Sequence, residues 1–306
     1  MSGIDAVRIT FSAQNLLLLN VSLGVIMFGV ALTLTVEDFR RLLANPWPAM
    51  VGVCSQFFLL PALTFGLVWW LRPQPSIALG MILVAACPGG NISNFMSMNA
   101  GSNTALSVTL TAISTVLAIV LTPLNLSFWG GLYTPATELL TTVDVSFAHV
   151  FRTVMLILGA PIVLGMAVRR WAGALARRLS RGLQLVSMII FAGIVASALW
   201  ANLRAMIGTI DVVFHLVLLH NALALGAGYL LAVGTRLPRD SRQTLALETG
   251  IQNSGLGLIL IFNFFDGLGG MALVAGWWGV WHILSGLALS FYWRSRPVPF
   301  VSQPAS

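Results

Sequence analysis

The sequence contains no lysine, only two cysteines and few charged residues of either sign. Charged residues make up 8% of its 306 positions, whereas soluble domains average about 25%. Hydrophobic residues make up 58%, and the mean hydropathy is +0.91. This composition excludes an ordinary soluble domain and predicts an all-α polytopic membrane protein.

Several chemical signatures are also missing. Cys54 and Cys87 lie inside apolar segments and form no disulfide or zinc pattern, so we expect two small buried hydrophobic residues. The sequence has no His-Glu-x-x-His, no Gly-x-Ser-x-Gly and no paired aspartates, which argues against an intramembrane enzyme. Residues 1–14 contain only Arg8 as a basic residue, so we expect no cleavable signal peptide.

Nine apolar segments are long enough to cross about 30 Å of hydrocarbon at 1.5 Å per residue. They lie near residues 15–35, 49–71, 77–99, 104–125, 147–168, 183–202, 209–233, 243–264 and 271–293. Residues 126–146 form the longest outer connection, and residues 169–181 are expected to be a basic amphipathic stretch on the inner surface.

All sixteen basic residues are arginines, and they give the chain a net charge of +7. Their positions between apolar segments are typical of membrane orientation rather than nucleic-acid binding. With the N-terminus outside, four lie on or near the outer face: Arg8, Arg72, Arg152 and Arg204. Twelve lie inside: Arg40, Arg41, Arg169, Arg170, Arg177, Arg178, Arg181, Arg236, Arg239, Arg242, Arg294 and Arg296. The excess predicts an outer N-terminus and an inner C-terminus.

The third segment begins as a membrane helix and is interrupted at Pro88-Gly-Gly90. Proline lacks an amide hydrogen and glycine has no Cβ, so neither favours a continuous helix. The polar residues Asn91, Ser93 and Asn94 follow at once. Unwound backbone survives in a bilayer only where protein, ions or water satisfy its polar groups, so this break is a candidate ion or substrate site. A packed Pro-Gly kink is the alternative.

The eighth segment is interrupted in the same way by residues 244–258, which include Glu248. A carboxylate at the centre of a membrane helix costs about 2.5–3.5 kcal/mol on insertion scales. No arginine lies inside the membrane segment to pair with it. Glu248 is therefore a candidate functional residue, and a protonated glutamate bonded to a neighbouring helix is the alternative.

The two interrupted segments occupy matching places, because each is third in a run of four: segments 1–4 and segments 6–9. An odd number of crossings separates the runs, so they face opposite ways. This pattern predicts an inverted repeat with substrate and ions at the repeat interface.

Other polar residues within the segments are less informative alone. Gln56 is compatible with an ordinary interhelical hydrogen bond. Ser107 and Thr111 share a helix face but commonly bond to their own helix carbonyls. His282, His220 and Asn221 are equally compatible with packing and with a site.

Two motifs carry a family resemblance: Cys87-Pro-Gly-Gly-Asn-Ile-Ser-Asn94, continuing to Ala105-Leu-Ser-Val108, and Glu248-Thr-Gly-Ile-Gln-Asn-Ser-Gly255. Over residues 18–293 the chain resembles the bile acid:sodium symporter family. The resemblance implies a single transporter unit, residues 1–306, with two crossed discontinuous helices. Its core domain would comprise 49–125 and 209–293, and its panel domain 15–35 and 147–202.

The resemblance also implies two sodium ions and a bound organic anion, with hard oxygen ligands suited to sodium. The first sodium site would use Ser93, Asn94, Ser107, Thr111 and Glu248. The second would use Gln56, Glu248, Thr249, Ile251 and Gln252. The substrate would lie near Asn91, Asn253, Ser254 and His282. Asn91 replaces a threonine of bacterial relatives, and Ile283 replaces a family asparagine, so these substrate contacts differ from the family pattern.

The implied function is sodium-coupled uptake of an organic anion, a carboxylate or a bile-acid-like molecule, by alternating access in the bacterial inner membrane. The expected partners are the small anion and the lipid bilayer, with no nucleic acid and no obligate protein partner. The alternative is a proton-coupled or efflux carrier of organic anions on the same scaffold, with Glu248 titrating.

Overall fold

The computed structural model describes residues 3–9, 13–33, 37, 40, 46–136, 139, 147–201 and 203–296. Arg41 lies outside these residues, as do the side chains of Arg177, Arg181 and Arg204. Within the described part, the regular structure is helical, and the only extended pairing is two isolated bridges.

Each of the nine predicted segments coincides with helix in the described residues. The first four are α1 (Ala13–Ala31), α3–η2–α4 (Pro46–Cys54, Ser55–Leu59, Leu60–Leu71), α5 with α6 (Pro75–Ala86, Ile92–Asn99) and α7 (Thr104–Leu132). The fifth is α9–η4–α10 (Phe147–Val154, Met155–Gly159, Ala160–Trp171). The others are α11 (Gly173–Ala201), α12 (Leu203–Gly234), α13 with α14 (Arg239–Gly250, Ser254–Phe264) and α15 (Gly269–Arg294).

Five stretches of helix in the described chain are long and apolar enough to cross a bilayer, which agrees with a polytopic membrane protein. Three shorter apolar helices accompany them, namely Leu16–Ala31, α5 and α14. At 12 and 11 residues, α5 and α14 extend only about 18 and 16 Å, so neither crosses alone. The breaks in the third and eighth segments therefore explain why α5 and α14 are too short to cross a bilayer. The number of crossings stays a prediction.

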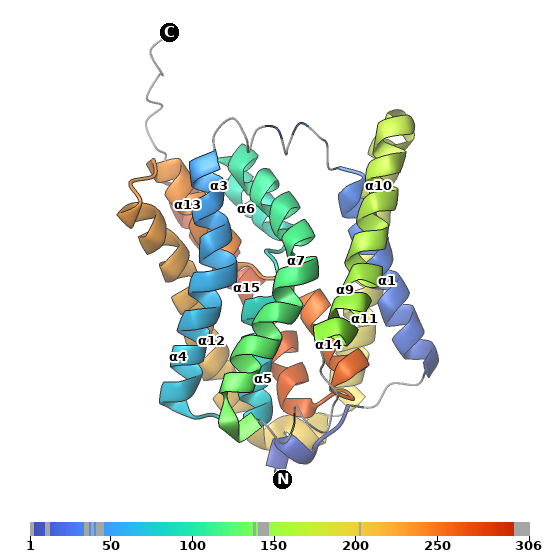
Figure 1. The fold of residues 1–306 in the computed structure, drawn as a ribbon, viewed down its shortest axis with the longest axis vertical. Helices are drawn as coiled ribbons and strands as arrows, with labels where there is room; N and C mark the ends of the chain where they lie inside the picture. The colour runs from blue at the N-terminus through green and yellow to red at the C-terminus, as the bar shows by residue number, and fades with distance from the viewer. Residues whose placement is uncertain are drawn as a thin grey trace.

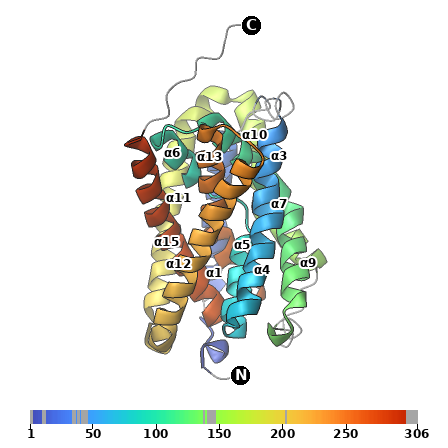
Figure 2. The same cartoon turned by 90° about the vertical axis from the view of Figure 1, so that its left-hand side faces the viewer.

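Helix α1 packs against α10 and α11, and these helices stand on one side of the molecule (Figure 1). The other side contains α3–α4, α12 and α13 around the central helices, as the turned view shows (Figure 2). This grouping follows the predicted panel and core ranges, but the division into two domains stays a prediction.

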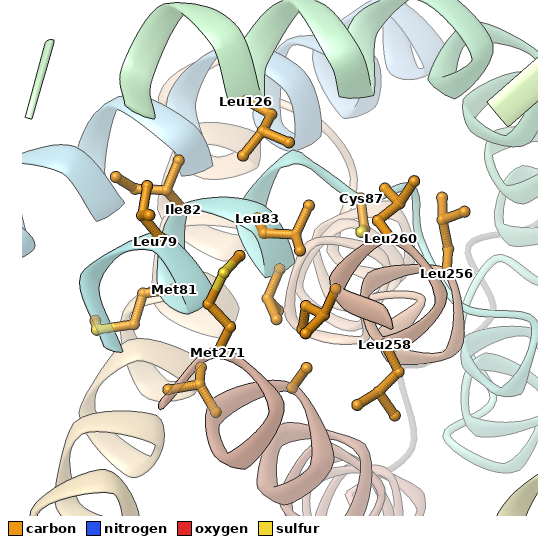
Figure 3. Packing of buried hydrophobic residues seen from close by; sticks show 14 of the residues in the cluster. Leu79, Met81, Ile82, Leu83, Cys87, Leu126, Leu256, Leu258, Leu260 and Met271 are labelled. Atoms are coloured by element: carbon orange, nitrogen blue, oxygen red, sulfur yellow. The ribbon is translucent and has the colours of Figure 1, made fainter. Parts of the chain in front are cut away.

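The buried core surrounds α5, in which every residue from Ser76 to Ala86 is buried. Its apolar side chains lie beside Met271 of α15 and Leu126 of α7, and Leu260 of α14 lies beside Cys87 at its end (Figure 3). Gly80 permits the close contact with α15, because a Cβ there would lie 2.9 Å from the Met271 Cα. The sequence of a helix that is buried on all sides is apolar around its whole circumference, and α5 has such a sequence.

The N-terminal residues secure one end of this core. Ile9 N donates to Gly267 O (2.8 Å) and Gly269 N donates to Val7 O (2.9 Å), so residues 7–9 line the turn before α15. Asp5 Oδ1 accepts a hydrogen bond from Ser76 N (2.9 Å) at the start of α5. Helix α15 then runs 26 residues, about 39 Å, to the opposite end. Residues 3–9 and the last turn of α15 thus lie at opposite ends of the molecule (Figure 2).

The structure corrects two sequence interpretations. Helix α7 continues through Pro123 to Leu132, so residues 126–132 are helix rather than connection. Residues 169–181 are not an element of their own, because α10 ends at Trp171 and α11 starts at Gly173; their position at the inner surface stays a prediction. Arg169 Nη1 donates to Gly173 O (3.4 Å) across the junction of the two helices.

Candidate ion-binding site

The two interruptions meet at the centre of the molecule. Gly90 N donates to Ile251 O (2.7 Å), and Asn253 N donates to Pro88 O (2.8 Å). Between these bonds, Gly89 and Gln252 form an isolated antiparallel bridge. The two unwound strands thus satisfy each other's backbone groups, which makes a double break compatible with a membrane interior. The predicted breaks are present, and they cross.

Glycine is required where the strands cross. A Cβ on Gly89 would lie 3.0 Å from Glu248 Oε2 and 3.1 Å from Gln56 Nε2. A Cβ on Gly90 would lie 3.2 Å from Gln252 O. These separations are tighter than most real Cβ contacts, so a side chain at either position would displace the neighbouring strand or the glutamate.

Neighbouring helices satisfy the carbonyls at the two broken C-terminal ends. Thr122 Oγ1 of α7 donates to Ala86 O (2.7 Å) at the end of α5. Asn221 Nδ2 of α12 donates to Gly250 O (2.8 Å) at the end of α13. The last carbonyls of a helix lack partners within it, so these bonds satisfy one carbonyl at each break.

Glu248 lies at the centre of a buried cluster of oxygen atoms. Its Oε1 accepts hydrogen bonds from Ser93 Oγ and Ser107 Oγ, both at 2.5 Å, and Thr111 Oγ1 lies 3.2 Å from both carboxylate oxygens. Asn94 Oδ1 lies 2.9 Å from Ser107 Oγ and 3.2 Å from Thr111 Oγ1. All five predicted residues of the first sodium site therefore meet, from α6, α7 and α13.

A second group of polar atoms surrounds the backbone of residues 248–252. Gln56 Nε2 donates to Glu248 O (3.3 Å), and Gln252 Nε2 donates to Thr249 O (2.7 Å). The Oε1 atoms of Gln56 and Gln252 are both buried and have no hydrogen-bond partner in the described structure. Two buried amide oxygens without partners are energetically costly unless a cation or donor meets them.

Ile251, the remaining predicted member of this second group, contributes only its backbone. Its carbonyl already accepts the bond from Gly90 N, and an oxygen with two lone pairs can accept a second interaction. Its side chain is buried beside Met96.

The predicted substrate residues surround the two N-terminal ends of the second half-helices. Asn91 and Asn253 are the residues before α6 and α14, and Asn253 Oδ1 caps α14 by accepting from Leu256 N (3.0 Å). A Cβ on Gly279 of α15 would lie 2.8 Å from Ser254 Oγ. His282 is buried, and its Nδ1 has no partner among the described groups.

His282 faces the crossing because of its register on α15. Gly279, His282 and Gly286 follow a spacing of three and four residues, which puts them on one helix face. Gly279 contacts Ser254, and a Cβ on Gly286 would lie 2.5 Å from Met96 Sδ and 2.7 Å from Ile251 Cδ1. All four predicted substrate residues therefore lie around the crossing.

Two polar residues at the site carried no clear signal in the sequence. Ser55 Oγ lies 2.8 Å from Thr249 Oγ1, and Asn221 Oδ1 accepts from Ser285 Oγ (2.6 Å). Ser55 precedes Gln56 in the π-helical turn η2, which widens the helix there and lets both residues face α13. In the sequence, only an interruption of the regular helical spacing at Ser55 could have indicated that both residues face α13.

The donor set suits a hard monovalent cation. It has one carboxylate, three side-chain amides, several hydroxyls and unwound carbonyls, and no group of three His, Cys, Asp or Glu able to hold a metal occurs in the described residues. Oxygen-only sites with few charges suit alkali ions rather than zinc or copper. Crossed, broken helices around buried oxygens define a membrane transporter of the discontinuous-helix class.

Comparison with known proteins identifies the family. The profile of the Sodium Bile acid symporter family matches residues 20–209, and the chain belongs to this family. It is 36% identical over 278 residues to the "Uncharacterized sodium-dependent transporter YocS" of Bacillus subtilis (strain 168), covering 91% of this chain and 83% of that protein. The family and its named relatives are transporters, so this chain is a transporter and not an enzyme.

More distant relatives come from plants and animals. The chain is 32% identical over 285 residues to the "Probable sodium/metabolite cotransporter BASS2, chloroplastic" of Oryza sativa subsp. japonica, covering 92% of this chain and 65% of that protein. It is 31% identical over 245 residues to the human "Sodium/bile acid cotransporter 4", covering 77% and 54%. This chain therefore spans less than two thirds of these two relatives' own length.

Proposed function

We propose that the protein is a sodium-coupled symporter that takes up an organic anion, a carboxylate or a bile-acid-like molecule, by alternating access. The observation that carries the proposal is the single carboxylate of Glu248 between two groups of buried oxygens. The Oε1 atoms of Gln56 and Gln252 lack any donor in the described structure, and a sodium ion would provide the missing positive charge.

Two sodium ions would use these two groups. The first would be bound by Ser93, Asn94, Ser107 and Thr111 with the Glu248 carboxylate. The second would be bound by Gln56, Thr249, Gln252 and the carbonyl of Ile251, again with Glu248. The hydroxyl hydrogens that now point at Glu248 would turn away, so that each oxygen presents a lone pair to the ion.

Charge balance then favours an anionic substrate. Two sodium ions and one glutamate leave about one net positive charge, and the sequence has no arginine in the segments that cross. The N-terminal ends of α6 and α14 lie at the crossing, and each carries roughly half a positive charge. The amides of Asn91 and Asn253, with Ser254 and His282, would orient the anion there.

In alternating access, the core domain would move against the panel domain, and the two halves of the chain would form an inverted repeat. The first helix of each broken segment starts beside the turn that follows the other broken segment. Ser76 of α5 contacts Gly270 at the start of α15. Ser241 of α13 accepts a hydrogen bond from Asn103 Nδ2 (3.3 Å), which lies between α6 and α7. Reciprocal placement of this kind supports two related halves. An amide pair joins the proposed panel to the core, because Asn263 Nδ2 donates to Asn20 Oδ1 (3.0 Å).

The test is a thermal-shift screen of small carboxylates and bile acids against purified protein in sodium or in potassium. A substrate at one hundred times its dissociation constant should stabilise the protein by about 2.7 kcal/mol in sodium. The same compound should have little effect in potassium, because the anion site then lacks two positive charges. Equal stabilisation in both salts would contradict sodium coupling and favour the proton-coupled alternative.

A further inference from the structure

Two cavities lie one above the other along the seam between the second and fourth segments. The inner cavity, about 450 Å³, is apolar and is lined by residues that include Phe57, Phe58, Leu124 and Phe128. The second cavity, about 590 Å³, lies nearer the N-terminal end of the molecule and is lined by Trp69, Arg72 and Tyr133, among others. We call these cavities together the α4–α7 groove, and α4 and α7 flank it in the lower half of Figure 1.

The second and fourth segments line both cavities, which follow one another along these helices. The rings of Phe65 and Trp129 are 5.2 Å apart at the junction, and both are only half-buried. From Phe57 to Arg72 the helix rises 15 residues, about 22 Å. Half of a bilayer's hydrocarbon core is about 15 Å thick. The helix between these residues is longer than this by about the thickness of the headgroup layer.

The groove is apolar at its deep end and cationic at its shallow end. Phe58 and Phe128 are 59% and 55% exposed, so the deep end presents aromatic surface to the bilayer. Trp69 is 62% exposed, and tryptophan is typical of the interface between lipid and water. Arg72 is exposed and makes no side-chain hydrogen bond or ion pair to the residues that the structure describes.

The backbone of Arg72 is fixed in place. It ends α4 in the left-handed conformation (φ 47°), with its amide donating to Val68 O (2.9 Å), and Pro73 follows. Asp5, at the same end of the molecule, is buried, and its carboxylate accepts a hydrogen bond from the amide of Ser76. Among the described residues no carboxylate pairs with the Arg72 guanidinium, so it can meet an anion at the level of the headgroups, where membranes provide phosphate.

We propose that the α4–α7 groove binds one glycerophospholipid of the leaflet on the N-terminal face. Its phosphate pairs with Arg72, and one acyl chain lies over Phe65 and Trp129 into the apolar cavity. The site is independent of the sodium and substrate sites, since it faces lipid rather than the crossing. It requires no sodium and no transported anion.

Native mass spectrometry with added dioleoyl phosphatidylglycerol tests the proposal in potassium, without any substrate. Wild-type protein should retain one lipid, and Arg72→Gln should weaken retention by about tenfold because a charge-assisted pair is lost. Arg236→Gln is the matched control, since Arg236 is also an exposed arginine with positive φ (58°) at a helix end. It should retain lipid as the wild type does.

A second pair of variants tests the acyl chain. Ala62→Trp fills the apolar cavity and should abolish retention, whereas Leu164→Trp, at a 60% exposed position of α10, should not. Circular dichroism verifies folding of each variant. Dioleoylglycerol, which lacks phosphate, should be retained weakly, and glycerol phosphate alone should not compete. Equal retention by all variants would overturn the proposal, as would full competition by glycerol phosphate.

Discussion

The Glu248→Gln substitution removes the negative charge at the crossing and keeps the size and shape of the side chain. Glutamine can still accept hydrogen bonds from Ser93 and Ser107 through one oxygen, so the folded arrangement should persist. What disappears is the negative charge shared by the two proposed sodium ions. Unit charges 4 Å apart attract by about 4 kcal/mol at the effective dielectric constant of protein sites. Since 1.36 kcal/mol is a factor of ten, sodium binding should weaken by about three orders of magnitude.

The assay is thermal unfolding in detergent with sodium replacing choline at constant ionic strength. At one hundred times the wild-type dissociation constant, sodium should stabilise the wild type by about 2.7 kcal/mol. For a chain of 306 residues, an unfolding entropy of about 2.1 cal/mol/K per residue converts this to about 4 °C. Glu248→Gln should show a shift below about 0.2 °C under the same conditions.

Glu37→Gln provides the matched control. Glu37 is an exposed glutamate whose described contact is an ion pair with Arg40 at 3.9 Å, so the same chemical change there should leave the sodium-dependent shift intact. If Glu248→Gln kept the wild-type shift, the carboxylate would not be a sodium ligand. The hydrogen bonds from the three hydroxyls would then make it a structural residue.

Three further changes test separate parts of the structure. Gln252→Ala removes an unpaired amide oxygen, so the sodium concentration for half-maximal thermal stabilisation should rise; an unchanged midpoint would remove it from the second site. Gly89→Ala forces a Cβ to within 3.0 Å of Glu248 Oε2, so it should cost about 1–3 kcal/mol and abolish the sodium shift. Asp5→Ala removes the cap on Ser76 N and should cost about 1 kcal/mol with the sodium midpoint unchanged, whereas a changed midpoint would connect this end to the ion site.

The sequence predicted the helical segments and both breaks well, because hydropathy, Pro88 with two glycines, and an embedded Glu248 are strong local signals. It also predicted which polar residues would lie together, although that came from a family resemblance and not from spacing. Ser107 and Thr111 illustrate the difference. Their shared helix face is visible in the sequence, but Asn94 and Glu248 as their partners depend on how distant segments pack.

Other features depend on packing alone. The pairing of Gly89 with Gln252 joins residues far apart in the chain, and no periodicity encodes it. Asp5 precedes the first predicted segment, so its capping of α5 has no local signature. The start of α11 was placed too late because its arginines suggested a surface stretch, whereas arginines are also favourable at the ends of membrane helices.

Uptake into proteoliposomes tests sodium-coupled symport most directly. A carboxylate or bile acid selected by the thermal screen would be added outside vesicles under an inward sodium gradient, an equal potassium gradient, or an inward proton gradient without sodium. Accumulation above the external concentration should occur only with the sodium gradient, and Glu248→Gln should abolish it. Accumulation of the same size under the proton gradient alone would contradict sodium coupling and identify a proton-coupled carrier.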